Sequence, residues 1–134
     1  MKKKYIFELP MKVRDYEVDS EGIVNNAVYL HYLEHTRHEF CEMAGISFRK
    51  MHESGIDPVL NKVEITYKTP LGLGERFTSC LNLSREGARF IFHQDIYNAE
   101  GKLTVEAIVS CVTTVNGRLT RGDELASAFH EYLT

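Results

Sequence analysis

Hydrophobic and polar positions follow two different periods along this chain, and each change of period marks a predicted element. From residue 11 to residue 16 apolar and charged residues alternate, which is the period of a half-buried strand. After Gly22 a helical pattern takes over, from Asn26 to Ala44, and Gly45 stops it. One face of this predicted helix carries the apolar residues Tyr29, Leu33, Phe40 and Ala44. The opposite face carries His31, His35, His38 and Glu42.

The rest of the chain is dominated by predicted strands. A short helix with Ser47 as its N-cap comes first. Apolar residues then recur with a period of two in four runs, at 59–67, 77–83, 90–96 and 103–115. A last helix is expected from Asp123 to Leu133, with Asp123 as its N-cap. Because a long helix precedes a run of strands, the order predicts an α+β fold, and no repeat or linker divides residues 1–134, so we expect a single domain.

Composition places the chain among soluble globular proteins. Its 134 residues suffice for one core, and 43% hydrophobic with 26% charged residues is typical of that class. No apolar run is long enough for a membrane-spanning helix, so we expect no membrane partner. The start, Met1 to Glu8, has the positive end of a signal peptide without its apolar middle, which predicts a cytoplasmic protein. Three widely separated cysteines, Cys41, Cys80 and Cys111, favour reduced thiols over a disulfide framework.

Charge and histidine spacing exclude two further classes. A net charge of −3 argues against general nucleic-acid binding, which needs a basic surface. The pairs Arg85 with Arg89 and Arg118 with Arg121 are either ordinary solvated charge or a site for a phosphorylated ligand. The three helix histidines have the spacing of metal ligands, but no acidic or cysteine motif completes a zinc set, so we expect no metal.

The stretch from Asp19 to Tyr29 carries the most chemical information. It places a carboxylate at the end of a predicted strand, then a turn at Gly22, then the start of the long helix. A carboxylate near the exposed N–H groups of a helix start can attack a carbonyl, or activate water against it, while those N–H groups polarise the carbonyl oxygen. The alternative is that Asp19 only satisfies the turn before the helix, a place that aspartate favours.

The wording of this segment resembles the hot-dog fold acyl thioesterases, in particular the 4-hydroxybenzoyl-CoA thioesterase-like group. From Arg14 to Leu30 the chain has that family's aspartate, two variable residues, glycine, aliphatic residue, valine and paired asparagines before an aromatic. Residues 32–37 are similar to its helical Tyr-Leu-x-x-x-Glu-x-x-Arg pattern. Weaker matches follow at 67–71, 90–98 and 116–118. The resemblance implies an antiparallel sheet wrapped around the long helix, with subunits joined edge to edge as a homodimer or homotetramer.

The same resemblance implies roles for individual residues. Asp19 corresponds to the nucleophile or general base, and the backbone amide of Asn26 corresponds to the donor that polarises the thioester carbonyl. Gly22 would permit a positive φ angle or a close approach of the acyl chain. Apart from the resemblance, the side chains of Asn25 and Asn26 either take part in the site or only fix the turn, and the residues leave both roles open. Residues expected to contact the substrate are Ile23, Asn25, Ala27 and Tyr29.

A second group of expected contacts lies between two predicted strands. There Arg85, Gly87, Ala88 and Arg89 correspond to family positions near the pantetheine arm and nucleotide phosphates, and arginine suits phosphate through its forked donors.

Two positions separate this chain from branches of the family. Glu34 corresponds to a catalytic carboxylate in another branch, but its spacing favours a structural pair with Arg37. A catalytic Asn-x-His found in some acyl carrier protein thioesterases is not supported, because Glu21 and Ile23 stand at those positions. Histidine is frequent at position 23 in relatives that act on long acyl chains, whereas several aryl- and short-acyl-CoA relatives have isoleucine.

The leading hypothesis is hydrolysis of an acyl-CoA or acyl carrier protein thioester without a cofactor. A hot-dog hydratase is disfavoured because such enzymes pair the aspartate with a nearby histidine, and the first histidine after Asp19 is His31. A non-catalytic domain that binds acyl-CoA is the remaining alternative. The acyl length, an aryl or alkyl preference, the carrier and the role of Asp19 stay open.

Overall fold

The computed structural model describes residues 3–133, and an antiparallel sheet dominates it. The strands are β1 (Phe7–Lys12), β2 (Ile56–Tyr67), β3 (Arg76–Glu86), β4 (Arg89–Asn98), β5 (Leu103–Val115) and β6 (Arg118–Leu119). Their order across the sheet is β1-β3-β4-β5-β2, and β6 pairs with β5. Met1 and Lys2, which belong to the charged start considered above, lie outside the described residues.

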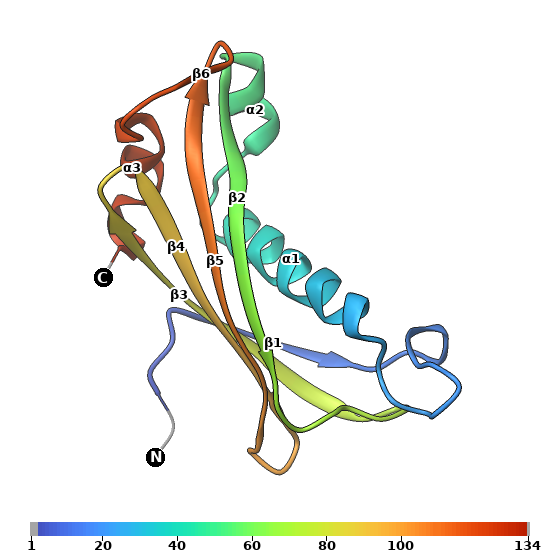
Figure 1. Ribbon diagram of the computed structural model, residues 1–134. Helices are drawn as coiled ribbons and strands as arrows, with labels where there is room; N and C mark the ends of the chain where they lie inside the picture. Colours follow the sequence, from blue (N-terminus) through green and yellow to red (C-terminus); the bar gives the residue numbers. More distant parts are fainter. Residues whose placement is uncertain (1–2, 134) are drawn as a thin grey trace.

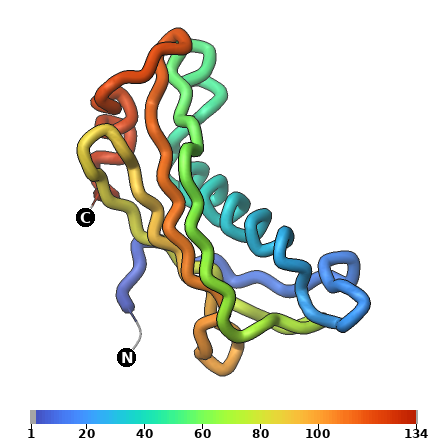
Figure 2. Tube along the Cα trace, viewed as in Figure 1, coloured from blue at the N-terminus to red at the C-terminus, as the bar shows by residue number. Residues whose placement is uncertain are grey.

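The helices are α1 (Asn26–Met43), α2 (Phe48–Glu53) and α3 (Asp123–Phe129), with 3₁₀ turns at Asp15–Glu17 and His130–Tyr132. The sheet curls around α1, which crosses its concave side, while α3 lies beside the far end of β3 and β4 (Figure 1). The tube trace shows the same arrangement, with α2 next to the beginning of β2 (Figure 2). The predicted α+β fold, a sheet wrapped around a long helix, is therefore confirmed.

The buried face of α1 contacts two separate parts of the core. Its first half carries Tyr29, Tyr32 and Leu33 into a cluster with residues of β3, β4 and β5. Its second half carries Phe40 and Cys41 into a cluster that includes α3. Between them lies the fully buried Thr36, whose hydroxyl lies 2.7 Å from both the Tyr32 carbonyl oxygen and the Ser79 hydroxyl. A polar contact thus joins helix and sheet where the two apolar clusters meet.

The structure corrects the prediction of a strand over residues 11–16. Strand β1 lies earlier, at Phe7–Lys12, and Asp15 and Tyr16 belong to a 3₁₀ turn. The turn forms because the carboxylate of Glu17 bonds back to the Arg14 backbone N–H, at 2.7 Å, which a strand would not allow. The alternation of polar and apolar residues gives no information about this local hydrogen bond.

The predicted N-cap of the last helix is also wrong. Gly122 occupies that position with φ of 88°, and Asp123 is the first helical residue. A Cβ at residue 122 would meet a ring carbon of Phe90 at 2.9 Å, so glycine is required both by its backbone angle and by the close packing. The helix ends at Phe129, and the rest of the predicted span to Leu133 is mainly the second 3₁₀ turn.

Candidate active site

The segment between β1 and α1 forms a closed loop. Val18 and Val24 pair as an antiparallel bridge, and the Asp19 N–H donates to the Ile23 carbonyl at 2.9 Å. The Gly22 N–H donates to the Asp19 carbonyl at 3.0 Å, which closes a tight turn. Gly22 has φ of +79° with open space where a Cβ would lie, so the backbone angle is what requires glycine. The predicted positive φ is confirmed.

The loop is fastened on one side to the segment that precedes β3. The Val24 N–H donates to the Leu71 carbonyl at 2.9 Å, and Ile23 pairs with Gly72 in a second bridge. Leu71 itself is held by the long helix, because its N–H donates to the Tyr29 hydroxyl at 3.0 Å. The loop therefore has a fixed position between α1 and the sheet.

On the other side a buried carboxylate, that of Glu17, fastens the loop to α1. Glu17 is 7% exposed and accepts from the Arg14 N–H at 2.7 Å, the Arg14 guanidinium at 2.9 Å and the Tyr32 hydroxyl at 2.8 Å. Burial alone would raise its pKa, but these donors together lower the pKa of Glu17 below its ordinary value. The Glu17 carbonyl also accepts from the Asn25 N–H at 3.1 Å, so this residue touches the helix start twice.

Neither Glu17 nor Tyr32 was among the residues selected from the sequence. The spacing of Arg14 and Glu17, three residues apart, is that of a capping box and was the available signal. Tyr32 begins the family's helical pattern, but that pattern did not indicate its contact with Glu17, which depends on the tertiary fold.

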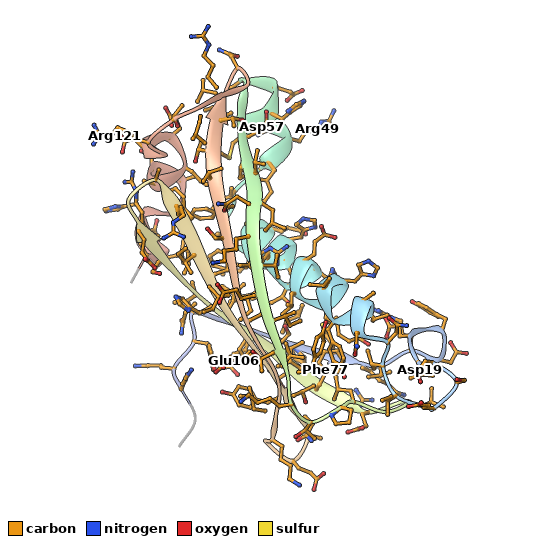
Figure 3. All side chains as sticks on the ribbon, viewed as in Figure 1. Asp19, Arg49, Asp57, Phe77, Glu106 and Arg121 are labelled. Carbon is orange, nitrogen blue, oxygen red and sulfur yellow. The ribbon has the colours of Figure 1, made fainter. Side chains whose placement is uncertain are left out.

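Asp19 lies exposed on this loop, as Figure 3 shows at the end of the molecule beyond the start of α1. Its Oδ1 accepts from the Glu21 N–H at 2.8 Å, which is the turn-forming role considered above. Its Oδ2 has no hydrogen-bond partner within residues 3–133. One carboxylate oxygen thus supports the turn, and the other is available to a ligand.

The first helical N–H groups have different environments. Asn25 is the N-cap, and its side-chain oxygen accepts from the Ala27 N–H at 2.9 Å, which confirms that it fixes the turn. The Val28 N–H donates to the Asn25 carbonyl at 2.9 Å. The Asn26 N–H has no acceptor in the described part of the chain, while the Asn26 carbonyl accepts from the Tyr67 hydroxyl at 3.0 Å. The amide of Asn26 is therefore the free donor at the electropositive end of α1.

The sequence also matches a known protein family over most of its length. Residues 13–130 match the family model described as the thioesterase-like superfamily. The chain belongs to this superfamily.

Curated relatives and solved structures agree with the assignment to the thioesterase-like superfamily. The chain is 39% identical over 85 residues to the acyl-acyl carrier protein thioesterase ATL3 of Arabidopsis thaliana, covering 63% of this chain and 45% of that protein. It is 33% identical over 104 residues to the long-chain acyl-CoA thioesterase FadM of Escherichia coli, covering 76% of this chain and 78% of that protein. The match thus spans about half the length of the plant relative.

Among solved structures, the probable thioesterase YbaW of Escherichia coli superimposes with a TM-score of 0.83. The two are 27% identical, and the match covers 95% of this chain and 98% of that one. A 12:0-ACP thioesterase from Umbellularia californica, 12% identical with a TM-score of 0.85, shares the fold.

Other residues expected at the site lie elsewhere or have structural partners. Tyr29 is buried in the core, where its hydroxyl holds Leu71. Arg85 donates to the carbonyl oxygens of Gly87 and Arg121, both at 2.8 Å, and to the carboxylate of Asp123 at 2.9 Å. Its guanidinium also lies over the Phe90 ring, 5.4 Å from the centroid. Arg85 thereby joins the β3–β4 turn to α3.

The β3–β4 turn and the Asp19 loop are separated within one chain. Asp19 and Arg121 lie at opposite ends of the molecule in Figure 3. The hollow of about 380 Å³ beside the turn is lined by Arg85, Gly87, Ala88, Arg121 and Asp123. Arg89 pairs with Glu86 at 3.7 Å. A single chain therefore does not bring these residues to Asp19.

The predicted pair between Glu34 and Arg37 is not formed within 4.0 Å in the described part of the chain. The Arg37 guanidinium instead donates to the side-chain oxygen of Gln94 on β4 at 2.9 Å. Helical spacing favoured Glu34, but the buried amide of Gln94 offers an acceptor on the side of α1 that faces the sheet. His31, His35 and His38 are exposed, and His35 lies 3.6 Å from Glu39.

A cleft of about 510 Å³ opens between the second half of α1, α2 and strands β2 and β5. Cys41 and Cys111 line it, and burial raises the pKa of Cys41 to about 12 and of Cys111 to about 11. Both are therefore protonated at neutral pH and poorly suited as nucleophiles. Within residues 3–133 no three His, Cys, Asp or Glu side chains are grouped so that they could hold a metal ion.

None of the helices in the described residues has the length and apolar character needed to span a membrane.

Glu17 generates a pH-dependent prediction. Because its folded-state pKa is lowered, its stabilising contribution is complete above the ordinary glutamate pKa of 4.5 and is lost as pH falls through the lowered value. At about pH 7, Glu17→Gln should lower the free energy of unfolding by about 1–3 kcal/mol, since it leaves buried donors poorly satisfied. Urea unfolding at about pH 7 and about pH 3 should show this difference shrinking in acid. A difference that is the same at both pH values would contradict the assignment; Glu42→Gln, at an exposed position on α1, provides an acidic-residue control.

Proposed function

We propose that this protein hydrolyses an acyl thioester, carried by CoA or acyl carrier protein, to a carboxylic acid and a thiol. The observation that carries the proposal is the free Asn26 amide at the start of α1, placed just after a rigid loop that presents the unpartnered Oδ2 of Asp19. Membership of the thioesterase-like superfamily and the names of FadM and ATL3 support the same reaction class.

The two groups have complementary roles in this reaction. The Asn26 N–H donates to the thioester oxygen, whose negative charge grows as the carbon becomes tetrahedral, and the aligned peptide dipoles of α1 add to the stabilisation. Asp19 either attacks the carbon directly or removes a proton from the attacking water. When Asp19 attacks, the thiolate leaves, the acyl group remains on Asp19 as a mixed anhydride, and a water molecule then hydrolyses this anhydride to the acid. When Asp19 acts as a base, water adds to the carbon and the acid forms directly as the thiolate leaves. The departing thiolate is protonated in both cases, and neither a metal nor a cofactor is required.

The contacts around these groups would position the acyl thioester. Ile23 is half-buried and Ala27 is exposed beside the turn, so both can touch the thioester without disturbing the core. The Ala27 N–H is occupied by Asn25, which leaves Asn26 as the single donor of this pair. We retain the Arg85–Arg89 turn as a contact for the phosphates of the carrier, supplied by a second copy of the chain.

A homodimer formed through β2 completes the proposal. This strand ends the sheet order, is twelve residues long and exposes the apolar side chains of Val59, Leu60 and Tyr67. An open apolar edge of this length invites pairing with a second strand, and a twofold axis lets two identical edges pair. Two such dimers would form the tetramer that the family resemblance also allows.

The first prediction concerns Asp19. Replacing it by asparagine keeps an oxygen for the Glu21 N–H and removes the charge, so the loop should fold normally. We expect kcat/KM for thiol release from acyl-CoA substrates to fall about 100-fold or more. Asp15→Asn, an exposed change in the same segment, should retain wild-type turnover.

Equal turnover by Asp19→Asn and the wild type would remove Asp19 from the reaction. If the wild-type protein binds acyl-CoA in calorimetry and releases no thiol from either carrier, the protein is instead a non-catalytic acyl-CoA-binding domain.

The second prediction isolates the backbone donor. Asn26 is the first residue of α1, where proline is well tolerated, and the preceding Asn25 already has the extended angles (φ −62°, ψ 138°) that a following proline needs. Asn26→Pro removes the free N–H together with the side chain, and should lower kcat about 100-fold or more. Asn26→Ala keeps that N–H and should change kcat by less than about threefold. Similar rates for the two variants, with unchanged helix content by circular dichroism, would exclude this amide as the oxyanion donor.

The third prediction concerns assembly. Val59→Lys places a charge on the exposed β2 edge and should shift the molar mass from dimer to monomer in size-exclusion chromatography with light scattering. Leu119→Lys, at a more exposed apolar position on β6, serves as the control and should leave the mass unchanged. A wild-type protein that is monomeric at all concentrations tested would refute the β2 dimer.

A further inference from the structure

Arg37 is a half-buried cation on the helix face that looks toward the cleft, and Gln94 holds it there. Its guanidinium donates to the Gln94 side-chain oxygen at 2.9 Å. Gln94 is fully buried, and its amide nitrogen donates to the Leu33 carbonyl at 3.0 Å. The amide is thus fixed by α1 and in turn fixes the guanidinium, so Arg37 has a defined position rather than a free side chain.

This cation has no partner that matches its charge. No carboxylate in the described residues lies within 4.0 Å of its nitrogen atoms, although the negative charge of Glu34 acts on it from further away. Burial lowers the pKa of Arg37, as expected for a charge moved away from water. A guanidinium carries five N–H donors, and residues 3–133 provide an acceptor for one of those of Arg37.

The surroundings of Arg37 are mostly apolar. The cleft of about 510 Å³ is lined by the side chains of Phe48, Pro58, Leu60, Phe92, Val109 and Phe129. An adjoining cavity of about 170 Å³ shares Glu34, Arg37, Leu60 and Val109 with it and extends along α1 to Leu30. Together they form a groove that begins one turn after Asn26 and has the size of a small-molecule site. Arg37 lines both parts.

The mouth of the cleft is closed at one end by α2. His52 on α2 lies 2.6 Å from Asp57 on β2, ring nitrogen to carboxylate oxygen. Arg49 and Asp57 lie near each other at this end of the molecule (Figure 3), and both line the cleft. Arg49 also lines the cleft but is exposed, whereas Arg37 is half-buried and lines both the cleft and the adjoining cavity.

We infer that the groove takes an acyl group bearing an uncharged oxygen substituent, a ketone or hydroxyl, which accepts a hydrogen bond from Arg37. The inference rests on the proposed function for the identity of the ligand as a thioester. Apolar walls suit the hydrocarbon part, and the donors of Arg37 that have no acceptor among residues 3–133 can bond to a ligand oxygen. A carboxylate on the ligand is disfavoured in this groove because the carboxylate of Glu34 already lines both cavities.

The position of the oxygen follows from the helix. Arg37 lies eleven residues after Asn26, which corresponds to about 16 Å along α1 at 1.5 Å per residue. The oxygen substituent is therefore attached far along the acyl chain, and not to the carbon next to the thioester carbonyl.

Binding of CoA thioethers tests the inference without hydrolysis. The probes are S-alkyl-CoA thioethers with eight-, twelve- and sixteen-carbon chains, each compared by calorimetry with an analogue that carries a ketone at the penultimate carbon. We expect one chain length at which the ketone binds about tenfold or more tightly than the plain chain, the effect of a hydrogen bond to a charged donor. Arg37→Met should abolish this preference and Arg37→Lys should reduce it. Arg76→Met, an exposed arginine at the start of β3, should retain it.

The outcomes separate this inference from the proposed function. Equal binding of ketone and plain chains at every length, binding of neither, or a ketone preference that survives in Arg37→Met overturns it. Thiol release without any ketone preference leaves the hydrolase and removes the role of Arg37. A ketone preference that depends on Arg37, in a protein that releases no thiol, keeps the binding site and removes the hydrolase. Thermal unfolding of each variant verifies that a lost preference is not lost folding.

Discussion

The buried carboxylate of Glu17 is the interaction on which the candidate site depends. Three donors from the loop and α1 surround it, and its own carbonyl holds the Asn25 N–H. A carboxylate removed from water is unfavourable unless it is paired and hydrogen-bonded, so the protein gains most from this residue when loop and helix are both in place. The position of Asp19 relative to the start of α1 is consequently decided by a bond network and not by the flexible reach of a side chain.

The same design divides α1 into two functional halves. Its first turn contacts the loop, the Asn25 cap and Leu71, while the Asn26 amide has no acceptor among residues 3–133. Its later turns line the cleft, which lies between the helix on one side and α2 and β2 on the other. Thr36 and Ser79 link helix and sheet between these halves. A rigid helix therefore provides both a donor for the reacting carbonyl and a wall for the rest of the ligand, at a separation that the helix itself sets.

Much of the fold could be predicted from the sequence because its long elements are strongly periodic. The run from 103 to 115 alternates throughout and is β5, and Gly45 follows a helix that ends one residue earlier than expected. The failures occurred where one side-chain bond outweighs periodicity, as at Glu17, which turns residues 15–17 away from a strand.

The candidate site was predictable to a similar extent. Gly22 and Asn25 act within their own turn, so the local sequence was enough to predict what they do there, whereas the role of Asn26 is a prediction from the family resemblance. Partners that are distant along the chain were invisible: Gln94 replaces Glu34 beside Arg37, and Asp123 pairs with Arg85 rather than capping its helix. These contacts form only when distant elements such as β3, β4 and α3 come together in the folded chain, and the pattern of residues along the sequence does not show that they do. Arg37 is the clearest example of such a contact. A partly buried guanidinium with one neutral hydrogen-bond partner is less favourable for folding than an apolar side chain of similar size would be. Its place among apolar walls is therefore better explained by a ligand than by stability.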